Sequence, residues 1–99
     1  MLWAISCFDG PNAAALREQH VAAHRAHLMA SKDILLFAAP MQTDDGASAT
    51  GTLFILRADS RSAAQQFADA DPFARNGVFQ NTTVTSLRKG LWNPEVLSA

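Results

Sequence analysis

The segment REQHVAAHRAHL, residues 17–28, contains all three histidines of the chain. An α-helix turns by about 100° per residue, so steps of four and then three residues return to nearly the same face. His20, His24 and His27 therefore form one stripe along a predicted helix, whereas Arg25 is expected to point elsewhere. Histidines on the apolar side of a helix are unusual, and this stripe is where the sequence predicts chemistry.

The composition indicates one small globular domain. The chain has 99 residues, of which 48% are hydrophobic and 17% charged, values typical of a folded protein. A net charge of −1 argues against a nucleic-acid partner, which needs a basic surface. No window is apolar enough to predict a membrane span. The first ten residues lack signal-peptide features, and a single cysteine, Cys7, fits a reducing cytoplasm and is expected to be a small buried hydrophobe.

Turn and cap signals divide the chain into six predicted elements. The cluster Asp9-Gly10-Pro11 ends an opening strand, and Asn12 is a plausible helix N-cap. A proline at position 72 disfavours helical geometry in the residue before it and so ends the second helix. We predict strands at 2–8, 34–39, 51–58 and about 78–88, helices at 13–31 and 61–70, a loop at 41–50, and a tail at 90–99 without a clear period.

The predicted order βαββαβ is that of a ferredoxin-like α+β fold, an antiparallel sheet with helices on one face. Such a sheet normally alternates apolar and polar residues, but here both faces of the first and third strands are apolar. In the first strand Trp3, Ile5 and Cys7 are expected on the face opposite Leu2, Ala4 and Phe8, and in the third strand Leu53 and Ile55 on the face opposite Phe54 and Leu56. Two helices can cover only one face, so we predict a homodimer packed sheet to sheet.

Several short motifs give the chain a family resemblance. They are Arg17-x-x-His20, Ala39-Pro40-Met41, Asp69-Ala70-Asp71-Pro72-Phe73 and Gly77-Val78. Taken in this order and spacing, they resemble the YciI-like (YCII-related) family of small bacterial proteins, over nearly the whole chain. Two features depart from the family pattern: Ala39 stands where glycine is usual, and the interval from His20 to Pro40 is slightly longer.

The resemblance implies a fold, an assembly and a site. It implies a single YciI-like domain over residues 1–99 with the dimeric α+β barrel arrangement, and a site built from a histidine and an aspartate, by motif His20 and Asp71. It also implies relatives of the same fold such as muconolactone isomerase, and one family member is associated with dehydrochlorination of a chlorinated hydroxyquinol.

The pair His20 and Asp71 is the predicted catalytic pair. A neutral imidazole is a competent base near neutral pH, and a carboxylate on its other nitrogen fixes the tautomer. The alternative is a core histidine tied to a helix-end carboxylate for stability. Arg17, one turn earlier, is a candidate anchor for an anionic group, or else a solvated arginine paired with a carboxylate. Further candidate ligand-binding residues are His24, Pro40, Met41 and Phe73.

A metal site is the weaker interpretation of the histidine stripe. Positions i and i+4 can share one ion, but His27 lies a further turn along from His20 and His24, and no other ligand motif is present. We therefore predict no metal and no cofactor. In the interpretation without a metal, His24 and His27 pack beside Leu28, with their polar tips at the edge of the pocket or dimer.

The sequence thus predicts a cytoplasmic, cofactor-free enzyme that uses general acid–base chemistry on a small organic molecule. The reaction class is lyase or isomerase, including dehydrochlorination, and this class rests on the family resemblance alone. The alternative is a non-catalytic protein of the same fold that binds or senses a small ligand. A third possibility is a subunit that only dimerises, which needs no pocket.

Overall fold

The computed structural model describes residues 1–98 and has the predicted βαββαβ order with one additional short helix. The predicted element types are confirmed, and their ends shift by at most three residues. The elements are β1 (Leu2–Asp9), α1 (Ala13–Ala30), β2 (Leu35–Gln42), β3 (Ala49–Arg57), α2 (Arg61–Ala70), α3 (Pro72–Arg75), β4 (Phe79–Leu87) and a 3₁₀-helix at Pro94–Ser98.

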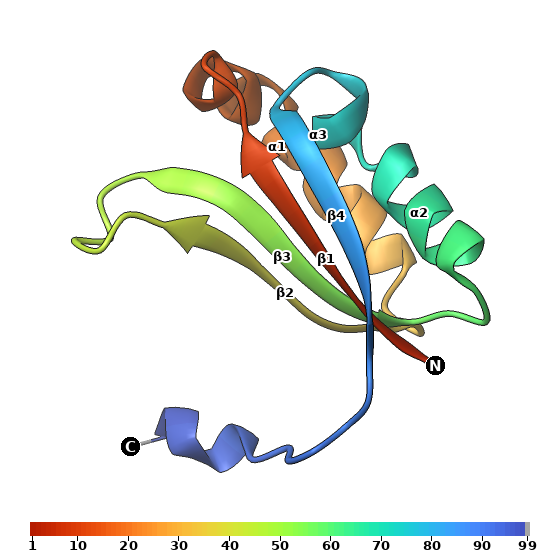
Figure 1. Cartoon of the computed structure of the whole chain (residues 1–99). Helices are drawn as coiled ribbons and strands as arrows, with labels where there is room; N and C mark the ends of the chain where they lie inside the picture. The colour runs from red at the N-terminus through yellow and green to blue at the C-terminus, as the bar shows by residue number, and fades with distance from the viewer. Residues whose placement is uncertain (99) are drawn as a thin grey trace.

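The four strands form one sheet in the order β2-β3-β1-β4, with every neighbouring pair antiparallel. The helices α1 and α2 lie together on one face of this sheet (Figure 1). The predicted ferredoxin-like α+β fold is therefore confirmed. Within residues 1–98, none of the helices combines the length and apolar character that crossing a membrane requires.

The predicted loop between β2 and β3 is shorter than expected, because both strands extend into it. The turn occupies residues 43–48, where the Thr43 amide donates to the Ser48 carbonyl over 2.9 Å and Gly46 has φ 72°. Glycine adopts this left-handed conformation without the steric cost that a Cβ atom would bring. The result is a tight hairpin whose edge strand, β2, faces α1.

The helix ends follow their capping chemistry only in part. The Ser60 side chain accepts from the Ala63 amide over 3.1 Å and caps α2, whereas Asn12, the predicted cap of α1, makes no side-chain cap bond. Asp71 ends α2 and also caps α3, since its Oδ1 accepts from the Phe73 amide over 2.9 Å. The helix α3 was not predicted, because four residues are too few to show a period.

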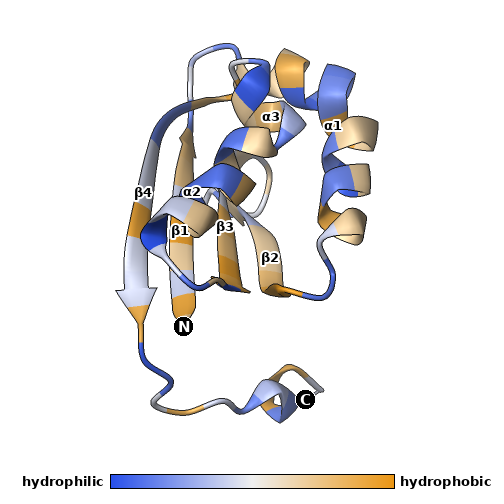
Figure 2. Cartoon of the chain, turned by 90° about the vertical axis from the view of Figure 1, so that its right-hand side faces the viewer, coloured by the Kyte–Doolittle hydropathy of each residue, from blue (hydrophilic) through white to orange (hydrophobic). Residues whose placement is uncertain are grey.

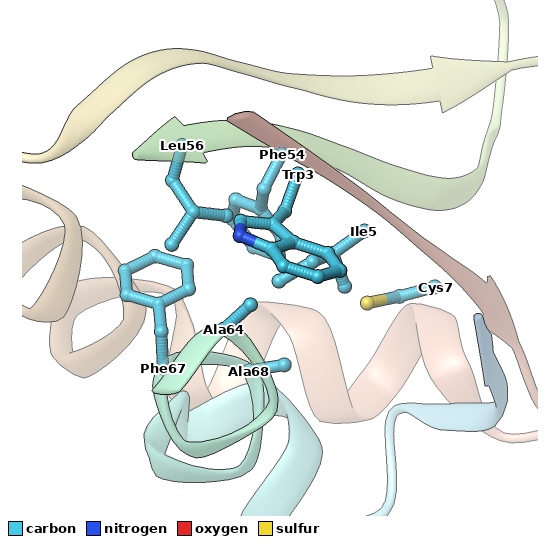
Figure 3. Packing of buried hydrophobic residues seen from close by; sticks show 8 residues of the cluster. All are labelled: Trp3, Ile5, Cys7, Phe54, Leu56, Ala64, Phe67 and Ala68. Atoms are coloured by element: carbon cyan, nitrogen blue, oxygen red, sulfur yellow. The ribbon is translucent and has the colours of Figure 1, made fainter. Parts of the chain in front are cut away.

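The main core lies between the sheet and α2. Side chains from alternate positions of β1 and β3 meet the inner face of α2, as Figure 3 shows. The cluster consists of Trp3, Ile5, Cys7, Phe54, Leu56, Ala64, Phe67 and Ala68. The prediction that Cys7 is a buried hydrophobe is confirmed, since its side chain is 1% exposed. Burial of each large apolar side chain stabilises the fold by about 1.5–3 kcal/mol.

The opposite face of the sheet has no helix over it. Strand pairing places on this bare face the residues Leu2, Ala4, Ser6, Phe8, Phe37, Ala39, Leu53 and Ile55. Phe8 and Phe37 are 44% and 38% exposed. Beyond β4 the chain leaves the body as an extended segment, residues 88–98, which we call the arm; Figure 2 shows it apart from the sheet and helices. Ala99, the last residue of the predicted tail, lies outside the described residues.

Candidate active site

A cavity of about 270 Å³ lies between α1 and the edge of the sheet formed by β2 and β3. Most of its wall is apolar, and four polar side chains face it. The apolar lining consists of Val21, Leu28, Ala38, Ala39, Pro40 and Phe73, and the polar lining of Arg17, His24, Arg25 and Thr52. Few polar groups in an apolar wall are typical of small-molecule sites.

His24 and Asp71 form a buried pair at this cavity. His24 Nδ1 lies 2.8 Å from Asp71 Oδ1, and the two residues are 8% and 0% exposed. An ionised carboxylate only accepts hydrogen bonds, so Nδ1 carries the proton and donates it to Asp71. The imidazole ring also stacks on Phe73, with ring centroids 3.9 Å apart and planes 7° from parallel. Both contacts fix the ring, and Nε2 keeps a free lone pair.

Local structure explains how Asp71 reaches this position. The carboxylate stands at the junction of α2 and α3, where Pro72 holds the first position of α3. Its Oδ1 accepts from both His24 and the Phe73 amide, which leaves Oδ2 buried with no hydrogen-bond partner among the described residues. Among residues 1–98, His24 is the only ion-pair partner of the Asp71 carboxylate.

The prediction that Asp71 pairs with His20 is wrong, because Asp71 pairs with His24. His20 is half-buried and makes no hydrogen bond or ion pair with any residue from 1 to 98. Residues four apart in a helix differ by only about 40° in direction but by about 6 Å along the axis. His20 and His24 therefore lie on one stripe of α1, but only His24 is level with α3. One signal in the sequence favoured His24. The interval from His20 to Pro40 is longer than the family pattern, and the interval from His24 to Pro40 is four residues shorter than that from His20.

His27 connects the two long helices. The carbonyl of Phe67, in α2, accepts a hydrogen bond from His27 Nε2 over 3.1 Å, and the His27 ring lies against the Phe67 ring with centroids 4.8 Å apart. Across residues 1–98, histidine, cysteine and acidic side chains do not gather in a group of three that could hold a metal ion. The three histidines of the stripe thus have three different environments.

Arg17 lines the cavity, but protein groups hold most of its guanidinium. Nε and Nη2 donate to the two carboxylate oxygens of Asp9 over 2.8 and 2.9 Å, and Nη2 also donates to the Gly51 carbonyl and Thr52 Oγ1. The guanidinium carbon lies 5.1 Å from the centre of the Phe73 ring. The predicted alternative, a solvated arginine paired with a carboxylate, is confirmed in its pairing but not in its exposure, because the Arg17 side chain is only 16% exposed and ties α1 to β1 and β3.

Arg25 is the cavity residue that the sequence reasoning missed. The helical wheel pointed it away from the histidine stripe, yet its long side chain reaches the rim of the cavity. It is exposed and forms no ion pair with any residue described. Because the Arg17 charge is matched by Asp9, Arg25 is the unmatched positive charge at this rim.

The remaining predicted ligand residues divide by strand alternation. Pro40 and Phe73 line the cavity, as expected of ligand-binding residues. Met41 does not: Pro40 pairs with Thr52 on the helix side of the sheet, whereas Met41 pairs with Gly51 and so points to the bare face.

Cys7 lies in the core and is not part of the cavity wall. Burial is the main cause that raises the pKa of its thiol from 9.0 to about 11, with the charges of Asp71 and Asp9 acting in the same direction. The thiol therefore stays protonated near neutral pH. A protonated, buried thiol is a poor nucleophile, so Cys7 is not a candidate for covalent chemistry.

Comparison with known proteins identifies relatives over most of the chain. The family model of the YCII-related domain matches residues 1–88. Protein YciI of Escherichia coli O6:H1 and that of Shigella flexneri are each 36% identical over 80 residues, which cover 76% of this chain and 80% of theirs.

Solved structures with a similar fold include one with a bound ligand. One is the 5-chloro-2-hydroxyhydroquinone dehydrochlorinase TftG from Burkholderia phenoliruptrix AC1100, in complex with 2,5-dihydroxybenzoquinone. It is 30% identical to this chain, with a TM-score of 0.82, and the match covers 91% of this chain and 96% of TftG. PA3566 from Pseudomonas aeruginosa is 15% identical with a TM-score of 0.54 over 91% and 93% of the two chains, and supports the fold alone.

Proposed function

The chain belongs to the YCII-related domain family, and from this premise we propose that it is a cofactor-independent enzyme that uses His24 and Asp71 for general acid–base chemistry. The proposed reaction class is elimination or isomerisation of a small organic molecule, and the dehydrochlorinase TftG is one precedent. One observation carries the proposal: His24 lies in the wall of a cavity of small-molecule size and is hydrogen-bonded to the buried carboxylate of Asp71.

In the proposed mechanism His24 moves the proton. Asp71 holds Nδ1–H, so Nε2 is the nitrogen that takes a proton from a hydroxyl or C–H group of the substrate. The electron pair left behind moves into the substrate as the leaving group departs, so an elimination releases one proton and one anion such as chloride. Because His24 is the only charge partner of the Asp71 carboxylate in the structure, the imidazolium formed in this step is stabilised by a full negative charge 2.8 Å away.

The cavity favours a small, flat substrate that carries negative charge. Phe73 and Pro40 provide apolar walls, and Arg25 places an unpaired guanidinium at the rim. A guanidinium binds carboxylates and phenolates through parallel hydrogen bonds. A hydroxylated or quinone-type ring of the kind bound to TftG fits this combination, and it is the substrate class we propose.

The proposed assembly is a homodimer formed through the bare face of the sheet. Leu2, Phe8, Phe37 and Ile55 contribute to an apolar surface on this face that no helix of residues 1–98 covers. A second copy would cover it by the same surface, as two-fold symmetry requires. The proposed location is the cytoplasm, where the free thiol of Cys7 suits a reducing compartment.

The test is a matched pair of histidine variants. Purified protein is titrated with 2,5-dihydroxybenzoquinone in a calorimeter and assayed for chloride release from 5-chloro-2-hydroxyhydroquinone. We expect His24→Gln to abolish turnover, because glutamine cannot take up the proton, and His20→Gln, one turn away and without protein partners, to leave it unchanged.

The outcomes separate three interpretations. Loss of turnover in His20→Gln but not in His24→Gln would contradict our choice of base. Binding that needs His24 without any turnover would favour the ligand-binding alternative. If neither compound binds, a panel of hydroxylated aromatic acids and lactones tests whether the substrate class or the cavity itself is wrong.

A further inference from the structure

The arm, residues 88–98, carries apolar side chains that find no cover within the described chain. Leu91 is 87% exposed, Trp92 52%, Val96 71% and Leu97 79%. The arm leaves the end of β4 and runs beneath the sheet, away from the helices (Figure 1). A folded segment that exposes four large apolar side chains is typical of a surface made for contact.

The arm and the bare face of the sheet form one continuous apolar surface. A hollow of about 280 Å³ lies where they meet, lined on the sheet side by Leu2, Leu36, Ile55 and Leu87, and on the arm side by Arg88, Lys89, Gly90, Leu91 and Trp92. The arm therefore stands at an angle to the sheet, and side chains of another molecule can enter between them.

The chemistry of this surface suits a second copy of the chain. The bare-face residues of β1 (Leu2, Ala4, Ser6 and Phe8) and their partners Leu53 and Ile55 of β3 are uncharged, and positive charges lie at the border, at Arg57 opposite Leu2 and at Arg88 and Lys89 beside the hollow. Charged residues are depleted at the centre of protein–protein interfaces, whose rim is polar. The flat sheet also offers the same surface to its own copy, which a two-fold dimer requires.

The size of the sheet face indicates that the arm takes part. Four strands about 4.8 Å apart and eight residues of about 3.3 Å each give a projected face of about 500 Å². Stable interfaces bury about 800 Å² on each partner. The sheet face alone is smaller than this, and the arm adds four apolar side chains at its border.

We propose that the arm is an intersubunit clasp: in the homodimer, each protomer holds the sheet of a second copy between its own bare face and its arm. This inference rests on the homodimer proposed above and goes beyond it, because the YCII-related domain matches only residues 1–88. The clasp lies outside the residues that the family model matches, and its partner is the same chain.

The experiment measures the dimer dissociation constant of full-length variants by sedimentation velocity across a dilution series. We expect Val96→Ser combined with Leu97→Ser to raise the constant tenfold or more, since each exposed apolar side chain would be buried in the dimer. Glu95→Gln, which changes a polar residue of the same 3₁₀-helix, is the matched control and should leave the constant unchanged.

Tryptophan fluorescence gives a second readout. Trp3 is buried in the core at 5% exposure, whereas Trp92 stands in the arm. Dilution of the wild type should shift its emission to the red as Trp92 becomes solvated, and Trp92→Phe should abolish this shift. A monomeric wild type would overturn the homodimer and the clasp together. A dimer whose dissociation constant is the same in the arm variants would overturn the clasp alone.

Discussion

Replacing Asp71 by asparagine tests the proposed catalytic pair, His24 and Asp71, with a minimal change. Asparagine has the same shape, and its Oδ1 can still accept from the Phe73 amide and from His24 Nδ1, as Asp71 does now. Its amide nitrogen would then occupy the place of Oδ2, which has no partner within residues 1–98. The variant therefore keeps the helix cap and the histidine tautomer, and removes only the charge.

The expected cost in stability is small. A hydrogen bond to a charged group contributes about 1.5–3 kcal/mol and a neutral one about 0.5–1.5 kcal/mol, so the loss is about 1 kcal/mol. For a domain of this size, that lowers the melting temperature by roughly 4–8 °C. Asp71→Ala should cost more, about 2–4 kcal/mol, because the α3 cap and the partner of His24 are both lost.

The expected cost in function is much larger. Without the carboxylate, nothing opposite His24 stabilises the imidazolium, and we expect turnover to fall by about 10²–10⁴. That factor equals about 3–5 kcal/mol of transition-state stabilisation at about 1.4 kcal/mol per tenfold. Thermal melts and turnover measured on the same preparations compare the two costs directly.

A double-mutant cycle between His24→Gln and Asp71→Asn measures whether the two residues act together. Groups in direct contact show coupling energies of about 0.5–3 kcal/mol, and His24 and Asp71 share a hydrogen bond of 2.8 Å. An Asp71→Asn protein that melts as expected and retains full turnover would refute the reasoning. So would a coupling energy near zero.

Three further predictions concern other parts of the chain. The pKa of Cys7 is raised from 9.0 to about 11 in the fold, so its contribution to the free energy of unfolding is complete below pH 9 and is lost as the pH rises towards 11. In urea unfolding from pH 8 to 11, Cys7→Ala should reduce this dependence of stability on pH. Arg25→Gln should weaken binding of anionic ring ligands about tenfold and reduce its salt dependence, measured by calorimetry at two ionic strengths. Gly51→Ala should destabilise the fold by about 2–3 kcal/mol, because its Cβ would overlap the Cys7 carbonyl oxygen, whereas Gly90→Ala, with open space around it, should be neutral in the same thermal melts.

The sequence predicts those parts of the fold that depend on local patterns. The strand Leu2–Asp9 and the helix Arg61–Ala70 follow from apolar runs and turn residues. The pairing partner of Asp71 depends instead on how far α1 slides along α3, which no local pattern encodes. His20 and His24 look alike on a helical wheel, so only tertiary packing distinguishes them. Long side chains add a similar problem, since Arg25 reaches the cavity from a position that points away from it.

The position of Asp71 is difficult to explain by stability alone. A serine or threonine at this position could cap α3 equally well without a buried charge, whereas Asp71 leaves one oxygen buried and unsatisfied within residues 1–98. An unsatisfied buried group costs about 1–3 kcal/mol, and more when it is charged. Natural proteins tolerate such a cost mainly at functional sites. A chain that keeps a carboxylate here, against the imidazole of His24 and beside a cavity, has the arrangement expected when the charge is needed for proton transfer.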